Sequence, residues 1–154
     1  MQPVTIPLLV HDISLLQIYT RLFSQEKLAL VVHRSPDTAL PLLLSTPFPV
    51  ILMDVTSVPG LKCLDAGLEE FSVRNVHAPD FYHRLTFYIL DRLRSPTSAN
   101  SKTPLVVSGL FGAEHDNLSP RLERRLLEHG ATAYVDITQL DHQLVHQVIT
   151  YLEK

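Results

Sequence analysis

The amino-acid sequence predicts one three-layer α/β domain, in which a five-stranded parallel sheet of strand order 2-1-3-4-5 lies between two layers of helices. Five short apolar segments alternate with segments whose apolar residues recur at helical spacing, a pattern typical of β-α-β units. The 154 residues suit a single domain with a sizeable core. Right-handed crossovers leave few arrangements of such units, and 2-1-3-4-5 is the doubly wound order that suits this length.

The strands are predicted from short apolar runs, at residues 6–10, 28–33, 50–54, 104–108 and 132–136. The third is the most informative, because four apolar residues run without interruption from Val50 to Met53 and end on Asp54. Such a run is typical of a strand that helices cover on both faces. Ligands of open α/β sheets lie beyond the carboxyl ends of the strands, so Asp54 is a candidate site residue. The alternative is that Asp54 only caps the following loop or helix.

The helices are predicted from capping residues and apolar stripes. Helix starts are indicated at Ser14, Ser35, Asp80 and Ser119, and an apolar stripe between Leu140 and Leu152 indicates a last helix. Pro41 lies inside the second of these helices, so we expect that helix to be short or kinked. We expect Gly130 to end the fourth.

Two segments interrupt the regular alternation. Residues 57–80 mix apolar and charged residues without a strong period, and residues 95–103 are rich in Ser, Thr, Pro and Asn. The second composition predicts an exposed loop. We therefore expect a single domain over residues 1–154 that contains an insertion around 57–80 and a loop around 95–103.

Composition and charge argue against several classes of function. The net charge is −3 and both signs are mixed along the chain, which gives no argument for nucleic acid or a membrane surface as partner. The apolar runs are too short to span a bilayer, and no basic stretch leads into an apolar segment at the N-terminus, so we expect a cytoplasmic protein. Cys63 is the only cysteine, which excludes an internal disulfide and a cysteine-based zinc cluster.

Polar residues follow the predicted strands at the edge where ligands are expected. His11 and Asp12 follow the first strand, Asp54 ends the third, Ser108 ends the fourth and Tyr134 lies in the fifth. In a parallel sheet these positions converge. Two neighbouring carboxylates can hold a hard cation such as Mg²⁺, which would let a carboxylate act as nucleophile toward a phosphoryl group.

At this edge the chain resembles the response-regulator receiver domain, which has a flavodoxin-like fold. Four segments carry the resemblance: Leu9-Val10-His11-Asp12-Ile13-Ser14, Val50-Ile51-Leu52-Met53-Asp54, Val106-Val107-Ser108-Gly109 and Gly130-Ala131-Thr132-Ala133-Tyr134-Val135. It implies a phosphoacceptor role for Asp54. It further implies Mg²⁺ ligation by Asp12, by Asp54 and by the backbone carbonyl of Thr56, contact of Ser108 with the phosphoryl group, and a switching role for Tyr134.

The chain departs from the family pattern at three positions. His11 replaces the first of two adjacent acids, Ile137 stands where the family has a lysine, and Pro59 falls one residue late. Isoleucine cannot replace a charge that pairs with phosphoryl oxygens. An imidazole beside Asp12 and Asp54 would suit a transition metal better than Mg²⁺. We favour the interpretation that His11 only fills the place of an acid in a silent site.

These departures favour a divergent receiver-like signalling domain that acts through protein–protein contacts, independently of phosphorylation, and is not an enzyme. One alternative is a true phosphoacceptor that takes a phosphoryl group on Asp54 in a two-component phosphorelay. A second is a small-molecule-binding or hydrolytic α/β protein that uses the same edge.

The resemblance implies a protein partner, which would be a histidine kinase, a phosphotransfer protein or another signalling protein. A basic run on the fourth predicted helix, Arg121, Arg124 and Arg125, can meet Asp136 and Asp141 of a second copy around a two-fold axis. We therefore hypothesise a weak, salt-sensitive homodimer. The alternative is a monomer whose arginines are solvated.

Overall fold

The computed structural model describes residues 4–10, 13–24, 26–54, 81–109, 119–136 and 143–153. Its strands are β1 (Val4–Leu9), β2 (Leu28–His33), β3 (Ile51–Asp54), β4 (Leu105–Gly109) and β5 (Ala133–Asp136). They form one parallel sheet of order β2-β1-β3-β4-β5. The predicted fold class and strand order are confirmed. The insertion expected around residues 57–80 lies outside the described residues.

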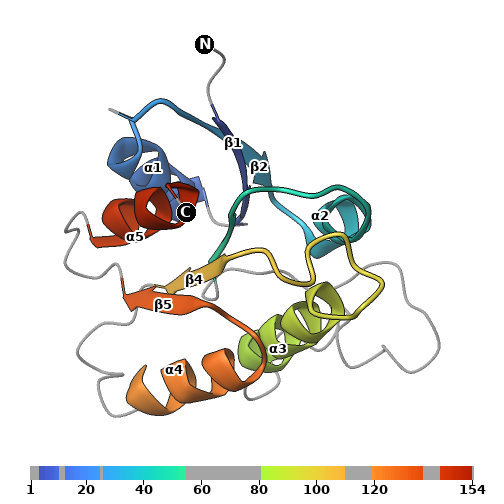
Figure 1. Cartoon of the computed structure of the whole chain (residues 1–154). Coiled ribbons are helices and arrows are strands. Elements are labelled where there is room, and N and C mark those ends of the chain that lie inside the picture. Colours follow the sequence, from blue (N-terminus) through green and yellow to red (C-terminus); the bar gives the residue numbers. More distant parts are fainter. Residues whose placement is uncertain are drawn as a thin grey trace.

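Helices cover both faces of the sheet (Figure 1). The helices are α1 (Ile13–Leu22), α2 (Pro36–Ser45), α3 (Phe81–Leu93), α4 (Ser119–Glu128) and α5 (Gln143–Leu152). α1 and α5 pack on one face, whereas α2, α3 and α4 pack on the other. α2 runs on through Pro41, whose ring is exposed. No helix in the described ranges is both long and apolar enough to pass through a bilayer.

β3 separates the two cores, as its unbroken apolar run predicts. Ile51 and Met53 pack on the side of α2, α3 and α4, whereas Val50 and Leu52 pack on the side of α1 and α5. Successive side chains of a strand point to opposite faces. The next position in this alternation, Asp54, therefore faces α1 and α5, at the carboxyl end of β3.

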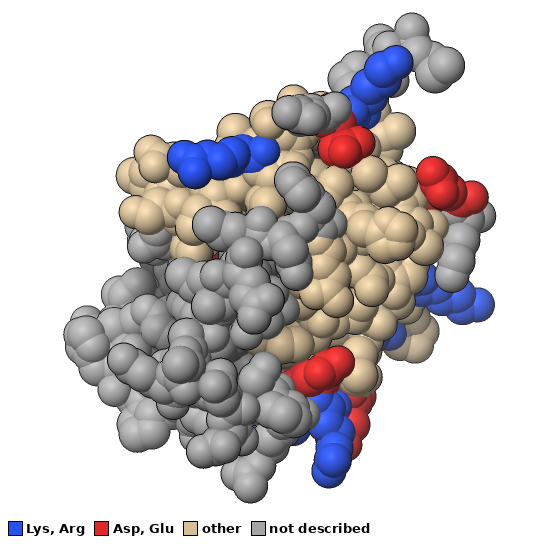
Figure 2. Space-filling view, turned by 90° about the vertical axis from the view of Figure 1, so that its left-hand side faces the viewer, with Lys and Arg blue, Asp and Glu red and all other residues tan. Residues whose placement is uncertain are grey.

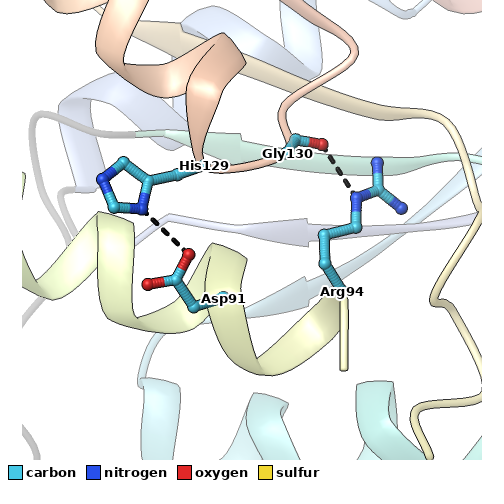
Figure 3. Close-up of polar contacts among 4 residues, drawn as sticks. All are labelled: Asp91, Arg94, His129 and Gly130. Atoms are coloured by element: carbon cyan, nitrogen blue, oxygen red, sulfur yellow. Dashed lines mark hydrogen bonds and ion pairs between the residues drawn. The ribbon is translucent and has the colours of Figure 1, made fainter. Parts of the chain in front are cut away.

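α3 is fastened to the end of α4 by two polar contacts (Figure 3). His129 Nδ1 lies 2.9 Å from Asp91 Oδ1, and its ring stacks on Phe87 with 4.5 Å between the ring centroids. Arg94, just after α3, donates from Nε to the carbonyl oxygen of Gly130 at 2.8 Å. Gly130 has φ +109°, a conformation that side chains other than glycine rarely adopt, and it ends α4 as predicted.

The prediction that residues 95–103 form an exposed loop is wrong at two positions, because Ser98 is 7% exposed and Asn100 is fully buried. The Asn100 side-chain amide donates to the carbonyls of Leu43 and Thr46, at the end of α2. Helix ends leave carbonyls without intrahelical partners, and a buried end needs donors from elsewhere. Asn100 supplies two of them, so this polar side chain points inward rather than to solvent.

Candidate functional site

The sheet brings Asp54 and Ser108 together at its carboxyl edge. β3 and β4 are neighbours, and their register places Asp54 directly opposite Ser108. Both residues are 0% exposed. Sequence analysis singled out both residues, although they are 54 positions apart in the chain. They lie side by side in the interior, on the face of the sheet toward α1 and α5.

A third residue, Tyr19 of α1, completes this site. Its hydroxyl donates to Asp54 Oδ2 at 2.5 Å and lies 2.5 Å from Ser108 Oγ. A phenol carries one proton and an ionised carboxylate can only accept. With Asp54 ionised, Ser108 therefore donates to Tyr19, and the three side chains form a chain of hydrogen bonds from β4 through α1 to β3.

The environment keeps Tyr19 in its neutral form. Burial raises the pKa of its phenol well above the ordinary value of 10.0, and the neighbouring charge of Asp54 raises it further. A deprotonated phenol would place a second negative charge beside the carboxylate in the interior of the protein. Tyr19 therefore remains a hydrogen-bond donor to Asp54 throughout the physiological pH range.

Comparison with known structures identifies the fold that carries this site. A putative response regulator from Chloroflexus aurantiacus superposes with a TM-score of 0.65 and 16% identity over 99% of both chains. The receiver domain of the sensor histidine kinase PA1611 from Pseudomonas aeruginosa, with a magnesium ion in its active-site cleft, gives 0.64 and 11% over 99% of both. The Francisella response regulator 1452 receiver domain gives 0.62 and 15% over 97% of both. No family model and no curated protein matches in sequence.

The chain has the fold of response-regulator receiver domains. The resemblance noted in the sequence is thereby confirmed at the level of fold. Identities of 11–16% reach no further than the fold, so the chemistry of the site has to be argued from the residues of this receiver-like chain.

Sequence analysis missed Tyr19 as a site residue, because the periodicity of α1 groups it with the apolar residues that face the core. Its partners lie 35 and 89 residues away, so no local motif connects them. The one available signal was chemical: a tyrosine at a core position needs a polar partner for its hydroxyl. Asp54 and Ser108 were the polar residues predicted nearby.

Tyr134 lies on the face of the sheet opposite to this trio, although it is near enough to Tyr19 to add to the raised pKa of that phenol. It pairs with Val107 in the sheet and packs against the core on the side of α2, α3 and α4, and its hydroxyl oxygen is buried. Ser108 faces the opposite side of the sheet. The switching role that the resemblance implies for Tyr134 stays a prediction.

The other residues of the expected site, His11, Asp12 and Thr56, lie outside the described residues, as does Ile137. In the described part of the chain, no three His, Cys, Asp or Glu side chains cluster closely enough to hold a metal ion. Mg²⁺ takes six oxygen ligands and usually keeps several waters. Asp54 is fully buried and one of its oxygens accepts from a phenol. The Mg²⁺ site that the resemblance implies stays a prediction.

Neither sign of charge dominates the described part of the face shown in Figure 2, where acidic and basic residues lie singly or next to one another among uncharged ones. This distribution agrees with the mixed charges of the sequence.

His33, at the carboxyl end of β2, gives the fold a dependence on pH. Burial lowers the pKa of its imidazole from 6.5. The folded state therefore disfavours the charged form, so its contribution to stability is present above pH 6.5 and is lost as the pH falls through the folded-state value. We expect the free energy of unfolding to fall between pH 7 and about pH 5, and to fall less in His33→Gln. Urea unfolding at both pH values measures this difference, and equal losses in the two proteins would contradict it.

Proposed function

We propose that this chain is a receiver-like signalling domain that acts through contacts with another signalling protein and does not depend on phosphorylation of Asp54. The shared fold supports the signalling role. The state of Asp54 supports independence from phosphorylation. Its carboxylate is inside the protein, and the Tyr19 hydroxyl binds one of its two oxygens.

The burial of Asp54 carries this proposal. To accept a phosphoryl group, a carboxylate oxygen must approach phosphorus to about 3–3.5 Å, with the leaving group on the opposite side. A donor molecule therefore has to reach the carboxylate from solvent. Asp54 and Tyr19 are both 0% exposed, so a donor in solvent does not reach the carboxylate oxygen. The identities of His11 and Ile137 support the same proposal, since neither residue provides the charge found at its position in the family.

Contacts with a partner require a surface, and α4 offers one. Arg124, Arg125 and Glu128 are exposed there, and Leu127 is 43% exposed. Apolar contacts supply most of the affinity at protein interfaces, while exposed charges set orientation. The weak homodimer on this face stays a prediction, because Asp141 and the Asp136 side chain lie outside what the structure describes.

A second candidate function is a true phosphoacceptor, with Mg²⁺ as cofactor and a histidine kinase or phosphotransfer protein as donor. The register of Asp54 opposite Ser108 favours it, because a nucleophile and a hydroxyl that could bind phosphoryl oxygens then lie side by side. The receiver domain of PA1611 holds magnesium in its active-site cleft. For this chain, the route requires Tyr19 to leave its position.

Intact-mass spectrometry after incubation with acetyl phosphate and Mg²⁺ separates the two functions. We expect the mass of the native chain to stay unchanged, because the buried carboxylate is inaccessible. Asp54→Asn is the control for modification at other residues. A gain of one phosphoryl group in the native chain that is absent from Asp54→Asn would overturn independence from phosphorylation and establish the second function.

A further inference from the structure

We propose that the Tyr19 side chain prevents phosphorylation of Asp54, and we call this side chain the lock. Asp54 would then be a latent phosphoacceptor, which becomes reactive when the Tyr19 ring is removed. This inference rests on the proposed function, since it explains why Asp54 is unreactive. The sequence offers two causes for the lack of reactivity of Asp54: residues of the family pattern that are missing, and a side chain that is added to the site. The inference assigns the effect to the added side chain, Tyr19.

The position of the Tyr19 hydroxyl is the first argument. It lies 2.5 Å from Asp54 Oδ2 and 2.5 Å from Ser108 Oγ, so it bridges the two strands. A phosphoryl group bonded to Asp54 and hydrogen-bonded to Ser108 would need the space between the same two oxygens. Tyr19 and a phosphoryl group therefore cannot occupy the site together.

The packing of Tyr19 is the second argument. The residue is 0% exposed, and its ring lies in the core formed by α1, α5 and the sheet, a cluster that includes Leu8, Leu52 and Val106. To leave, the ring would have to give up this burial as well as both hydrogen bonds. A buried aromatic side chain contributes several kcal/mol to a core, so thermal motion opens such a lock rarely.

The groups that the lock covers are the third argument. A carboxylate is a competent nucleophile toward phosphorus, and Ser108 supplies a hydroxyl beside it. With the ring removed, an Asp54 oxygen can attack the phosphorus of acetyl phosphate. The bond from phosphorus to the acetyl oxygen breaks, and acetate leaves with the electron pair. The product is an acyl phosphate on Asp54.

Tyr19→Leu tests the proposal, because leucine keeps an apolar side chain in the core and removes the end of the ring together with its hydroxyl. The chain is incubated with acetyl phosphate and Mg²⁺, and its intact mass is measured. We expect Tyr19→Leu to gain one phosphoryl group and Tyr19→Leu/Asp54→Asn to gain none. Val148→Ala is the matched control, since it loosens the same core from α5 and leaves Tyr19 in place. We expect Val148→Ala to stay unmodified.

Circular dichroism and thermal unfolding establish that each variant is folded, and Tyr19→Met replaces Tyr19→Leu if the leucine variant does not fold. A folded Tyr19 variant that stays unmodified while the native chain is also unmodified overturns the lock and leaves the proposed function standing. Modification of the native chain overturns the proposed function itself. Equal modification of Val148→Ala and the Tyr19 variant also overturns the lock, because general loosening would then suffice.

Discussion

Replacing Asn100 with alanine is expected to lower the free energy of unfolding by about 3–4 kcal/mol, although sequence analysis places this residue in an exposed loop. The side chain is fully buried and all of its polar capacity is used. Its amide group donates to the carbonyls of Leu43 and Thr46, and its oxygen accepts from the backbone N–H of Phe48 and from Thr103 Oγ1, both at 2.9 Å. Alanine leaves these four groups without this partner, in places that are buried or partly buried.

Two further variants make this expectation specific. Asn100→Asp keeps the shape and the accepting oxygen but turns an acceptor toward two carbonyls, so we expect a loss as large as that in Asn100→Ala. Thr97→Ala changes an exposed residue of the same segment, and surface changes of this kind usually stay within about 0.5 kcal/mol. Urea unfolding followed by circular dichroism gives all three values. Equal stability of Asn100→Ala and Thr97→Ala would contradict the capping role.

The sheet was predictable from sequence because its signals are local. A strand buried on both faces needs an unbroken apolar run, and the run that ends at Asp54 has no other simple explanation. The segment around Asn100 shows where this reasoning stops. Ser, Thr, Pro and Asn indicate that the chain turns, but they do not indicate whether their side chains meet water or cap a buried helix end.

The candidate site was predictable in part for the same reason. Asp54 and Ser108 were found because both end predicted strands, and parallel strands bring their ends to one edge. Tyr19 was not found, because its role depends on two contacts that are distant in sequence. Helical periodicity records that a tyrosine faces the core, but it does not reveal which polar group its hydroxyl will meet there.

Gly130 and Arg94 form the second place where a large effect is expected, and each residue depends on the other. The Arg94 guanidinium donates to three backbone carbonyls, those of Gly130 at 2.8 Å, Thr103 at 2.7 Å and Asn100 at 3.1 Å. Burial lowers the pKa of this guanidinium, so the carbonyls compensate a charge that is partly removed from water. Arg94→Ala is expected to cost about 3–4 kcal/mol of unfolding free energy, because those carbonyls lose a charged donor.

Gly130→Ala is expected to cost a similar amount through a different cause. The backbone at φ +109° is strained for any side chain, which costs about 1–3 kcal/mol. A Cβ there would also lie 2.5 Å from Arg94 Cγ, so the arginine would have to shift away from the carbonyls that it binds. Two mutations that disturb one contact do not add. We therefore expect Arg94→Ala/Gly130→Ala to lose less than the sum of the single losses.

A double-mutant cycle in urea measures this coupling. The matched control is Arg92→Ala, which removes an exposed arginine from the last turn of α3, two residues before Arg94. It should change the unfolding free energy by no more than about 0.5 kcal/mol. Strict additivity of Arg94→Ala and Gly130→Ala would contradict the close approach of the two residues. Arg94 Nη2 also lies 3.3 Å from Thr132 Oγ1, just before β5. Arg94 therefore connects the end of α3 with the segment containing Asn100 and with the start of β5. Coupling would show that Arg94 can make these contacts because residue 130, at the end of α4, has no Cβ.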